Sequence, residues 1–475
     1  MKKHLFVIIL ISCALIKAQS KSAKIDELLN TVFNNGNFSG AAYVSEDGKP
    51  VYHKGFGFSD IASKILIDDN TKFVVASISK QYTATIVMRL AEKGKLKLTD
   101  KLSDYVKEYP AEYGSKVTIH HMLSNTSGVP DFFSEEYMHG MLLKPHTYND
   151  LLNLMKGKPL EFEPGTKFKW SNMAWQMLGT IIEKATGKTY EQVLEEEIII
   201  PLKLKRTMVF QPDKKIKDIA AQGYIYRGGE YINSPEYYFC SQIAADGIVT
   251  SVEDLATFAD AVISGKLLSP ESMKLMFSPY IDSDSRIYKY GYGWYVGERG
   301  IGTSPKVTLK FMPGGMQGYQ SLFINIDNKY SIALVSNYGN APMGIIMNTI
   351  FNILLDQKYT LPKKPISPAL TKKLKSDGIT AMIAELKKIT ETAKDQYQAD
   401  EAAINQFAYE LLGGGFIDES INVFKYITEL NPKSWNAYDS LAEAFAQKGN
   451  VKEAINNYEK SIILNPTTQT ERKKL

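Results

Sequence analysis

The placement of strand-like segments constrains the fold of this chain more than any other feature. Two short strand-like segments, Gly40 to Val44 and Pro50 to Gly57, precede a mainly helical stretch from Ser77 to about Pro201. Further strand-like segments follow late, at Tyr290 to Val296, Val307 to Phe311, Tyr319 to Ile326 and Tyr330 to Ser336. This order predicts an α/β domain in which the early and the late strands form one sheet. A helix over Met343 to Leu355 would pack on this sheet and close the domain.

The length, composition and charge of the chain indicate how many domains it has and which classes of function are excluded. A chain of 475 residues is too long for one ordinary domain, so two or three domains are expected. Hydrophobic residues make up 44% and charged residues 23%, as in soluble globular proteins. The formal charge of +4 comes without a basic stripe interleaved with aromatic residues, which argues against nucleic-acid binding.

The last quarter of the chain has a different organisation. Prolines punctuate residues 359–370, which we interpret as a linker before a helical region over 371–475. Pro432 and Pro466 lie 34 residues apart, each after an asparagine, and the large and small residues before them share one register. This spacing is typical of tetratricopeptide repeats, here about 401–434 and 435–468. A plain helical hairpin is the alternative, and residues 376–392 are candidates for an additional irregular helical pair or cap.

The N-terminus has the features of an export signal. Residues 1–20 contain a short positive segment, a nearly unbroken apolar run from Leu5 to Ile16, and small residues suited to cleavage. Cleavage after Gln19 would remove three lysines and take the formal charge from +4 to +1. The sequence therefore predicts a periplasmic or secreted protein without a transmembrane span after signal removal. The alternatives are an uncleaved anchor and lipid attachment at Cys13, which the apolar residues after Cys13 argue against.

Cysteine and histidine residues give no sign of a metal site. Cys240 would be the only cysteine of the exported chain, so an internal disulfide is excluded. The six histidines show no ligand spacing, and we interpret His120 and His121 as packing and capping residues. We therefore expect neither a metal nor a cofactor.

Ser77-Ile78-Ser79-Lys80 is the only Ser-x-x-Lys sequence in the chain. It follows an apolar stretch and opens a segment with helical periodicity that stops at Gly94. A serine and a lysine three residues apart share one helix face, about a turn from each other. The amine can then take the hydroxyl proton while the oxygen attacks a carbonyl.

Several motifs in order give this chain a family resemblance. The region from Phe73 to Asp100 resembles the first motif of the serine β-lactamase and penicillin-binding peptidase superfamily, in the branch of class C β-lactamases, esterases and D-aminopeptidases. Further similar segments follow in the order of that branch: Thr118 to Val129, Phe162 to Asn172, Leu178 to Gly187, Ala245 to Leu255 and Gly314 to Tyr319. Ordered agreement of this kind is far more specific than an isolated Ser-x-x-Lys.

The resemblance implies an antiparallel sheet flanked by helices over residues 23–358, and acyl transfer as the chemistry. Ser77 would attack a carbonyl, with Lys80 holding or taking its proton. The oxyanion would lie between the backbone N–H of Ser77 and that of Met316, which follows Gly315 on a late strand. Asn172 would direct its amide toward Lys80 and the substrate.

Two positions depart from the family pattern. Trp170 stands where the family usually has a tyrosine that relays a proton to the leaving group, and an indole N–H can donate but not accept. Pro313 stands where a lysine or histidine usually begins the third motif, and it brings neither a charge nor an N–H. Asn125 replaces a histidine often found at its place, a change that we interpret as structural.

Two functions remain open at this point. In the first, the protein is an exported serine hydrolase that uses Ser77 and Lys80 on an amide or ester, with Trp170 as an aromatic wall. In the second, it is a catalytically impaired binding module that acts with a protein partner bound by the repeats. The substrate, whether a D-amino-acid peptide, an ester or a lactam, depends on pocket loops that the motifs do not determine.

Overall fold

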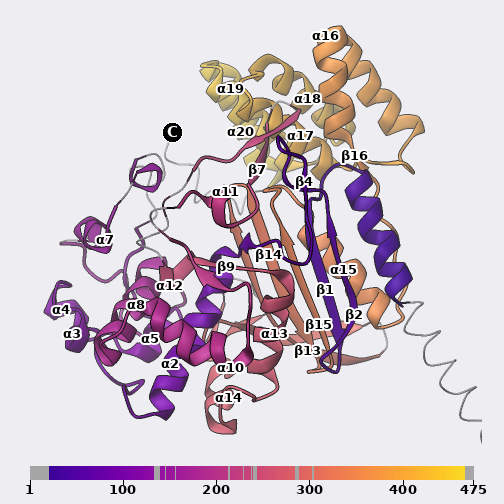
Figure 1. Ribbon diagram of the computed structural model, residues 1–475. Coiled ribbons are helices and arrows are strands. Elements are labelled where there is room, and N and C mark those ends of the chain that lie inside the picture. Colours follow the sequence, from indigo (N-terminus) through magenta and orange to yellow (C-terminus); the bar gives the residue numbers. More distant parts are fainter. Residues whose placement is uncertain are drawn as a thin grey trace, which may run out of the picture. The chain divides into compact units, whose positions relative to one another are not determined.

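The computed structural model describes residues 21–132, 140–144, 146–155, 157–211, 214–227, 229–236, 238, 243–283, 288–301 and 304–465. The predicted signal peptide with Cys13, and also Cys240 and Pro466, lie outside these residues. The described residues form two compact units (Figure 1), which divide at Tyr224, Ile232 and Tyr359. The first unit contains the chain up to Tyr224 together with Asn233–Tyr359, and the second contains Ile225–Ile232 together with the chain from Thr360.

An antiparallel sheet of eight strands forms the centre of the described part of the first unit. Its spatial order is β10 (Ile281–Asp282), β11 (Lys289–Tyr290), β12 (Tyr295–Ile301), β13 (Ser304–Met316), β14 (Tyr319–Ile326), β15 (Tyr330–Ser336), β1 (Gly40–Glu46) and β2 (Lys49–Phe56). Gly40 pairs with Ser336 and Glu46 with Tyr330, which joins the early hairpin to the late strands. The prediction that the early and the late strands form one antiparallel sheet is confirmed.

Helices lie on both faces of this sheet (Figure 1). A helix over residues 21–34 and α15 (Met343–Leu354) lie on one face. In α15, Ile346, Ile350 and Ile353 recur at helical spacing and are buried, which fixes the face that packs on the sheet. The other side carries α2 (Ser79–Glu92), α8 (Asn172–Thr186) and α13 (Val252–Ile263), with the shorter helices α3 (Leu102–Tyr105), α4 (Ala111–Gly114), α5 (Ile119–Leu123), α7 (Tyr148–Met155), α9 (Tyr190–Leu194), α10 (Ile200–Leu202), α11 (Ile216–Ile219), α12 (Ile243–Asp246) and α14 (Pro270–Met276).

A small three-stranded sheet brings together segments far apart in the sequence. Its order is β5 (Phe73–Val74), β9 (Ile248–Thr250) and β6 (Met208–Val209). Phe73 pairs with Thr250 and Val74 with Val249 in an antiparallel register. All four of these residues are buried, so packing holds the register in place.

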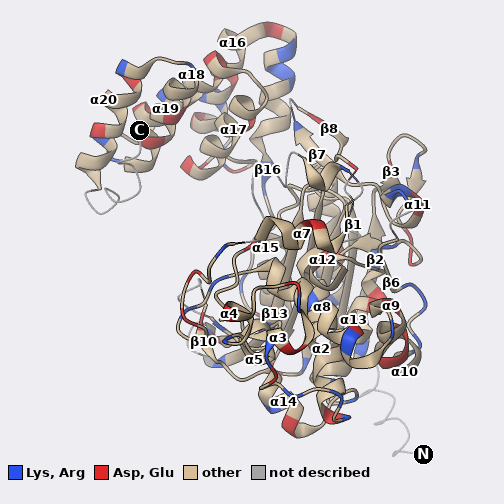
Figure 2. Cartoon of the chain, turned by 90° about the vertical axis from the view of Figure 1, so that its left-hand side faces the viewer, with Lys and Arg blue, Asp and Glu red and all other residues tan. Residues whose placement is uncertain are grey.

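The second unit is mainly helical. It contains α16 (Ile366–Thr392), α17 (Glu401–Gly413), α18 (Ile417–Leu430), α19 (Trp435–Gln447) and α20 (Val451–Leu464), with a short parallel pair of strands, β16 (Lys364–Pro365) and β17 (Tyr397–Gln398). Figure 2 shows basic and acidic segments interspersed along α16, α18 and α20. In the part of the chain that the structure describes, no helix combines the length and the apolar character needed to cross a membrane.

The start of α16 corrects the predicted linker at residues 359–370. The helix begins at Ile366, and Ile366 and Leu370 are buried in the core of the second unit. Pro368 falls in the first turn of the helix, where a backbone N–H is not needed for helical hydrogen bonding, so the proline does not break the helix. Gly378 (φ 82°) kinks α16 in its middle.

A hairpin from the middle of the chain belongs to the second unit. It is formed by β7 (Tyr224–Arg227) and β8 (Glu230–Asn233), and residues 225–232 pack with the helices. Lys375 forms an ion pair with Glu230 (2.6 Å), and the Arg227 guanidinium donates to the Gly413 carbonyl (3.2 Å). Sequence patterns gave no indication of this insertion, because the residues that it contacts follow it by more than a hundred positions.

Candidate active site

Ser77 lies where β5 turns into a helix. A short 3₁₀ turn over Ala76–Ile78 connects β5 to α2, so Ser77 stands at the beginning of a helical segment. Ala76 has a φ of 45°, a left-handed conformation that is unusual for a residue with a Cβ. Ala76 and Ile78 are buried, whereas Ser77 is half-buried. The backbone therefore holds a serine partly open to solvent at a sharp turn, as a nucleophile requires.

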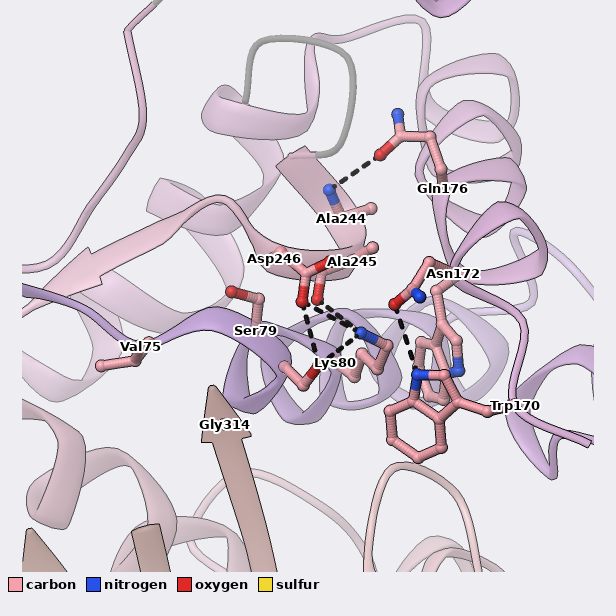
Figure 3. Close-up of polar contacts among 12 residues, drawn as sticks. Val75, Ser79, Lys80, Trp170, Asn172, Gln176, Ala244, Ala245, Asp246 and Gly314 are labelled. Carbon is pink, nitrogen blue, oxygen red and sulfur yellow. Dashed lines mark hydrogen bonds and ion pairs between the residues drawn. The ribbon is translucent and has the colours of Figure 1, made fainter. Parts of the chain in front are cut away.

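Two polar side chains contact the Ser77 hydroxyl. Lys80 Nζ lies 3.0 Å from Ser77 Oγ, and the Ser77 hydroxyl donates to Asp246 Oδ1 over 3.0 Å. Lys80 Nζ also donates to Asp246 Oδ1 (3.2 Å) and to the carbonyl oxygen of Ala245 (3.0 Å). Figure 3 shows Asp246 and the indole of Trp170 on two sides of the Lys80 amine. The predicted pair of Ser77 and Lys80 is thus within hydrogen-bonding distance, and a carboxylate that the sequence analysis did not assign joins it.

The register of β5 and β9 explains why Asp246 lies at this place. Val75 N donates to the Ile248 carbonyl (3.2 Å), which continues the pairing beyond Val74. Counting onward in the same antiparallel register places Ser77 opposite Asp246. A second hydrogen bond joins the same two segments, because the backbone N–H of Ile248 donates to the hydroxyl of Ser79 (2.9 Å). Backbone pairing of the neighbouring residues therefore brings Ser77 and Asp246, 169 positions apart in sequence, within reach of a side-chain hydrogen bond.

Burial controls the charge of Lys80. Its side chain has no exposed surface, and desolvation lowers the pKa of the amine below the usual range of a lysine. The Asp246 carboxylate acts in the opposite direction, through its charge and its hydrogen bond, but more weakly than burial. The Trp170 ring centroid lies 5.1 Å from Nζ, at cation–π distance. Burial thus favours the neutral amine, whereas the ion pair with Asp246 favours the ammonium form.

Trp170 and Asn172 lie beside Lys80, at the start of α8. The Trp170 indole packs edge-on against Tyr290, with ring centroids 5.9 Å apart, and its Nε1 donates to Asn172 Oδ1 (3.4 Å). The amide of Asn172 donates to Asp131 Oδ2 (2.9 Å), although the resemblance implied that it would be directed toward Lys80. Asp131 is thus a second carboxylate that the sequence analysis missed, and burial raises its pKa.

The end of β13 lies against the nucleophile turn. The pairing of β13 with β12 ends at Phe311, whereas its pairing with β14 continues to Gly315 and Met316, opposite Gln320 and Tyr319. A Cβ built on Gly314 would lie 2.3 Å from the Val75 carbonyl oxygen and 3.2 Å from Ser77 N. Only glycine allows this close approach. The structure therefore brings the strand that carries Gly315 and Met316 to the backbone of Ser77.

The adjacent histidines have structural contacts. His121 N donates to Thr118 Oγ1 (3.2 Å) and Thr118 N donates to His121 Nδ1 (3.3 Å), a reciprocal cap at the start of α5. His120 Nδ1 lies 2.6 Å from the Tyr292 hydroxyl. The interpretation of the pair as packing and capping residues is confirmed. Within the described ranges, no group of three histidine, cysteine or acidic side chains is arranged to hold a metal ion.

One signal in the sequence could have identified Asp246. The segment Ala245-Asp246-Gly247 places a carboxylate between small residues, immediately before the apolar strand β9. A charged residue at the boundary of a buried strand needs a specific partner, because burying an unpaired charge is costly. The missing information was the pairing of β9 with β5, which determines that this partner is the Ser77–Lys80 pair.

Comparison with known proteins assigns the family. A family model described as Beta-lactamase matches residues 23–349, which is well over half of the chain. The chain belongs to the beta-lactamase family. It is therefore related to penicillin-binding proteins and serine hydrolases of the same fold.

Curated relatives support the assignment. Penicillin-binding protein 4* of Bacillus subtilis is 29% identical over 370 residues, which cover 73% of this chain and 79% of that protein. Protein flp of Staphylococcus aureus is 28% identical over 325 residues, which cover 66% of this chain and 62% of that protein.

Solved structures agree with the fold. The octameric penicillin-binding protein homologue from Pyrococcus abyssi matches with a TM-score of 0.61 and 26% identity, over 74% of this chain and 81% of that one. EstCE1, a hydrolase with promiscuous acyltransferase activity, matches with a TM-score of 0.60 and 21% identity, over 71% and 99%. The D-amino acid amidase from Ochrobactrum anthropi matches with a TM-score of 0.60 and 19% identity, over 72% and 99%.

Proposed function

We propose that this protein is an exported serine hydrolase that transfers an acyl group from an amide or ester to Ser77. We place it in the branch of class C β-lactamases, esterases and D-aminopeptidases. The observation that carries the proposal is the 3.0 Å distance between Lys80 Nζ and Ser77 Oγ, with the lysine fully buried. Packing alone does not require a lysine at that place, because a buried amine costs desolvation energy that an apolar residue avoids.

The reaction follows from the groups around Ser77. Its oxygen attacks the carbonyl carbon, and the hydroxyl proton leaves toward the side chains beside it. The negative charge that develops on the carbonyl oxygen is stabilised by backbone N–H donors, for which Ser77 at the helix start and Met316 on β13 are our candidates. Gly315 precedes Met316 and keeps this edge free of a side chain. Trp170 forms an aromatic wall next to Lys80.

Labelling of the nucleophile tests the proposal. A fluorophosphonate should add one adduct per chain, measured as intact-protein mass. Ser77→Ala should abolish the adduct and Lys80→Ala should nearly do so, because a serine hydroxyl is a weak nucleophile without the amine that activates it. The exposed Ser115 provides the control, since Ser115→Ala should label like the parent protein. Labelling that survives Ser77→Ala would contradict the assignment of the nucleophile.

Two residues favour a second candidate function, that of a catalytically impaired binding module. Trp170 cannot act as the proton relay that a tyrosine provides, and Pro313 brings no charge to the site. A protein of this kind would bind its ligand without forming an acyl-enzyme, and would act together with a protein partner. The absence of an adduct in the folded parent protein would support this candidate.

We further propose that α17 to α20 are two tetratricopeptide repeats. The two helix pairs fall within residues 401–434 and 435–468, and the small residues of the expected pattern are buried where helices cross: Ala408, Ser420, Ala442, Ala454 and Ser461. Repeats of this type commonly present a concave surface to other proteins, so we assign the unit to partner binding.

Export is the remaining part of the proposal. It rests on the charged, apolar and small-residue segments of residues 1–20 and places the mature protein in the periplasm or outside the cell. N-terminal sequencing of the exported protein should begin between Gln19 and Ala23. A mature chain that starts at Cys13 would instead show lipid attachment, and one that starts at Met1 in the cytoplasm would contradict export.

A further inference from the structure

The proton of the Ser77 hydroxyl has an acceptor besides Lys80. Asp246 Oδ1 lies 3.0 Å from Ser77 Oγ and 3.2 Å from Lys80 Nζ. An ionised carboxylate can only accept hydrogen bonds, so the Ser77 hydroxyl donates to it. Lys80 Nζ meanwhile has three oxygen neighbours, on Ser77, Ala245 and Asp246, at 3.0 to 3.2 Å. An ammonium group has three donors and satisfies all three oxygens, but it then has no lone pair with which to take a proton.

The contacts of Asp246 differ from those of a structural carboxylate nearby. Asp254, in α13, accepts from the backbone N–H of Arg206 (2.7 Å) and from the hydroxyl of Thr207 (3.0 Å). These contacts anchor a loop to a helix. The side chain of Asp246 is 7% exposed, and its hydrogen bonds that the structure describes go to the nucleophile and to Lys80. Both carboxylates are buried, so the difference between them lies in their partners: Asp254 accepts from a loop, and Asp246 accepts from the two groups that would react.

We propose that Asp246 is a catalytic residue that takes the Ser77 proton and delivers it to the leaving group, in place of the phenol that is missing at Trp170. This inference rests on the proposed function and gives a role to a residue to which the resemblance assigned none. Lys80 then remains a charged donor that stabilises the oxygen of Ser77 as its proton departs.

The steps balance without a cofactor. In acylation the Ser77 O–H bond breaks, the proton moves to Asp246 Oδ1, and the Ser77 oxygen bonds to the carbonyl carbon. When the oxyanion collapses, the bond from carbon to the leaving nitrogen or oxygen breaks, and that atom takes the proton from Asp246. In deacylation, water gives a proton to Asp246 and its oxygen bonds to the acyl carbon; the bond from that carbon to the Ser77 oxygen then breaks, the Ser77 oxygen takes the proton from Asp246, and the acid product leaves.

A pair of substrates separates this role from the alternatives. A p-nitrophenyl ester releases a stable anion that needs no proton, whereas an alkyl ester or an anilide with the same acyl group releases a strongly basic atom. Asp246→Asn keeps the shape of the side chain but cannot carry the proton. All substrates lose the acceptor of the Ser77 proton, but only the alkyl ester and the anilide also lose the proton donor to the leaving atom, so their kcat/KM should fall further than that of the p-nitrophenyl ester, by about 10²–10⁴-fold, the range of general acid–base catalysis.

Two results would overturn the inference. An equal loss on all substrates would show that Asp246 does not deliver a proton to the leaving group, and no loss would show that Lys80 alone manages the proton. Asp260→Asn is the matched control, because Asp260 is a half-buried carboxylate of α13 that accepts from Ser45 and Ser331 outside the site, so kcat/KM should keep the parent ratio between substrates. Melting curves verify that each variant is folded.

The unmodified protein provides a second measurement, should Asp246→Asn fail to fold. Across a series of esters with leaving groups of increasing basicity, kcat/KM of the parent should decline only weakly, because the leaving atom receives a proton. A steep decline would overturn the inference while leaving the proposed function intact. If the parent protein forms no adduct with a fluorophosphonate, the proposed function fails first, so the two failures can be distinguished.

Discussion

Ser77 Oγ and Asp246 Oδ1 lie 3.0 Å apart, each three residues beyond the last pair, Val74 and Val249, of the ladder between β5 and β9. The same ladder determines the position of Lys80, because α2 begins directly after the turn that carries Ser77. The positions of the site residues therefore depend on the register between β5 and β9 as much as on the spacing of Ser77 and Lys80. Residues that maintain the register should influence catalysis without touching a substrate.

Ser79→Ala should weaken both stability and acylation. The Ser79 hydroxyl accepts the Ile248 N–H in a fully buried environment, so the variant leaves a buried donor unpaired. The free energy of unfolding should fall by about 1–3 kcal/mol. Urea unfolding and the rate of fluorophosphonate labelling measure the two effects. Ser115→Ala, at an exposed position, should change stability by less than about 0.5 kcal/mol, and equal losses in both variants would contradict the role of Ser79.

Gly314→Ala should disrupt the nucleophile turn. The new methyl group would lie 2.3 Å from the Val75 carbonyl oxygen, so β13 or the turn must move. We expect a lower melting temperature and a large loss of labelling at Ser77. Gly344 in α15 is the control, because a Cβ there meets no atom within 4 Å and Gly344→Ala should preserve or raise stability. Normal labelling in Gly314→Ala would contradict the close approach of β13.

Trp170→Tyr should change KM more than kcat. The indole packs beside Lys80 as a wall, and the proton of the leaving group is expected to come from Asp246, so a new phenol adds little to turnover. Steady-state kinetics on one alkyl ester and one anilide measure the two parameters. A rise in kcat of about 10²-fold or more would instead mean that the missing phenol limits proton delivery.

His121 should make the first unit sensitive to acid. Burial lowers the pKa of His121 below 6.5, and the charge of His120 acts in the same direction. The unfolded chain therefore binds the proton more readily, and stability that is present above pH 6.5 is lost as the pH falls through this window. His121→Gln keeps a side chain suited to the reciprocal cap but does not titrate. Its melting temperature should depend less on pH than that of the parent, and equal slopes would contradict the assignment.

Removal of the second unit should leave the first unit folded. A chain of residues 21–359 lacks the helices of the second unit but keeps the part at 225–232, together with the sheet, α2, α8 and the β5–β9 ladder, and we expect it to label at Ser77 at the rate of the full chain. Far-UV circular dichroism and intact-protein mass test this. An aggregated or unlabelled product would mean that the helical unit is needed to fold the first one, and would contradict a role limited to partner binding.

Much of the fold could be predicted because the sequence carries local periodicity. Tyr319–Ile326 and Tyr330–Ser336 are strands with the bounds expected from their β-branched and aromatic residues, and the helix at Met343 follows its apolar spacing. The prediction was wrong at the linker, because a proline in the first turn of a helix looks the same in sequence as one in a loop. Hairpin 225–232 was missed because its contacts in the second unit are distant in sequence.

Only part of the candidate site could be predicted, because some of its residues are close in sequence and others meet only through tertiary pairing. Ser77 and Lys80 are close in sequence, so helical spacing alone brings them together. Asp246 and Asp131 reach the site through tertiary pairing, and two-residue strands such as Phe73–Val74 are too short to leave a periodic signal. Local patterns identify residues that are neighbours along the chain, and long-range pairing adds the rest.

The ladder joins the chain at Val74 to the chain at Ile248. The residues between these two points therefore form a closed loop, as defined for polymer chains. The entropic cost of closing a loop grows only with the logarithm of its length, and each doubling adds about 0.6 kcal/mol. Insertions and deletions between these points are therefore inexpensive as long as the ladder persists. The segments inside this loop can lengthen, shorten and diversify to accept new acyl donors, while the distance between nucleophile and carboxylate stays the same.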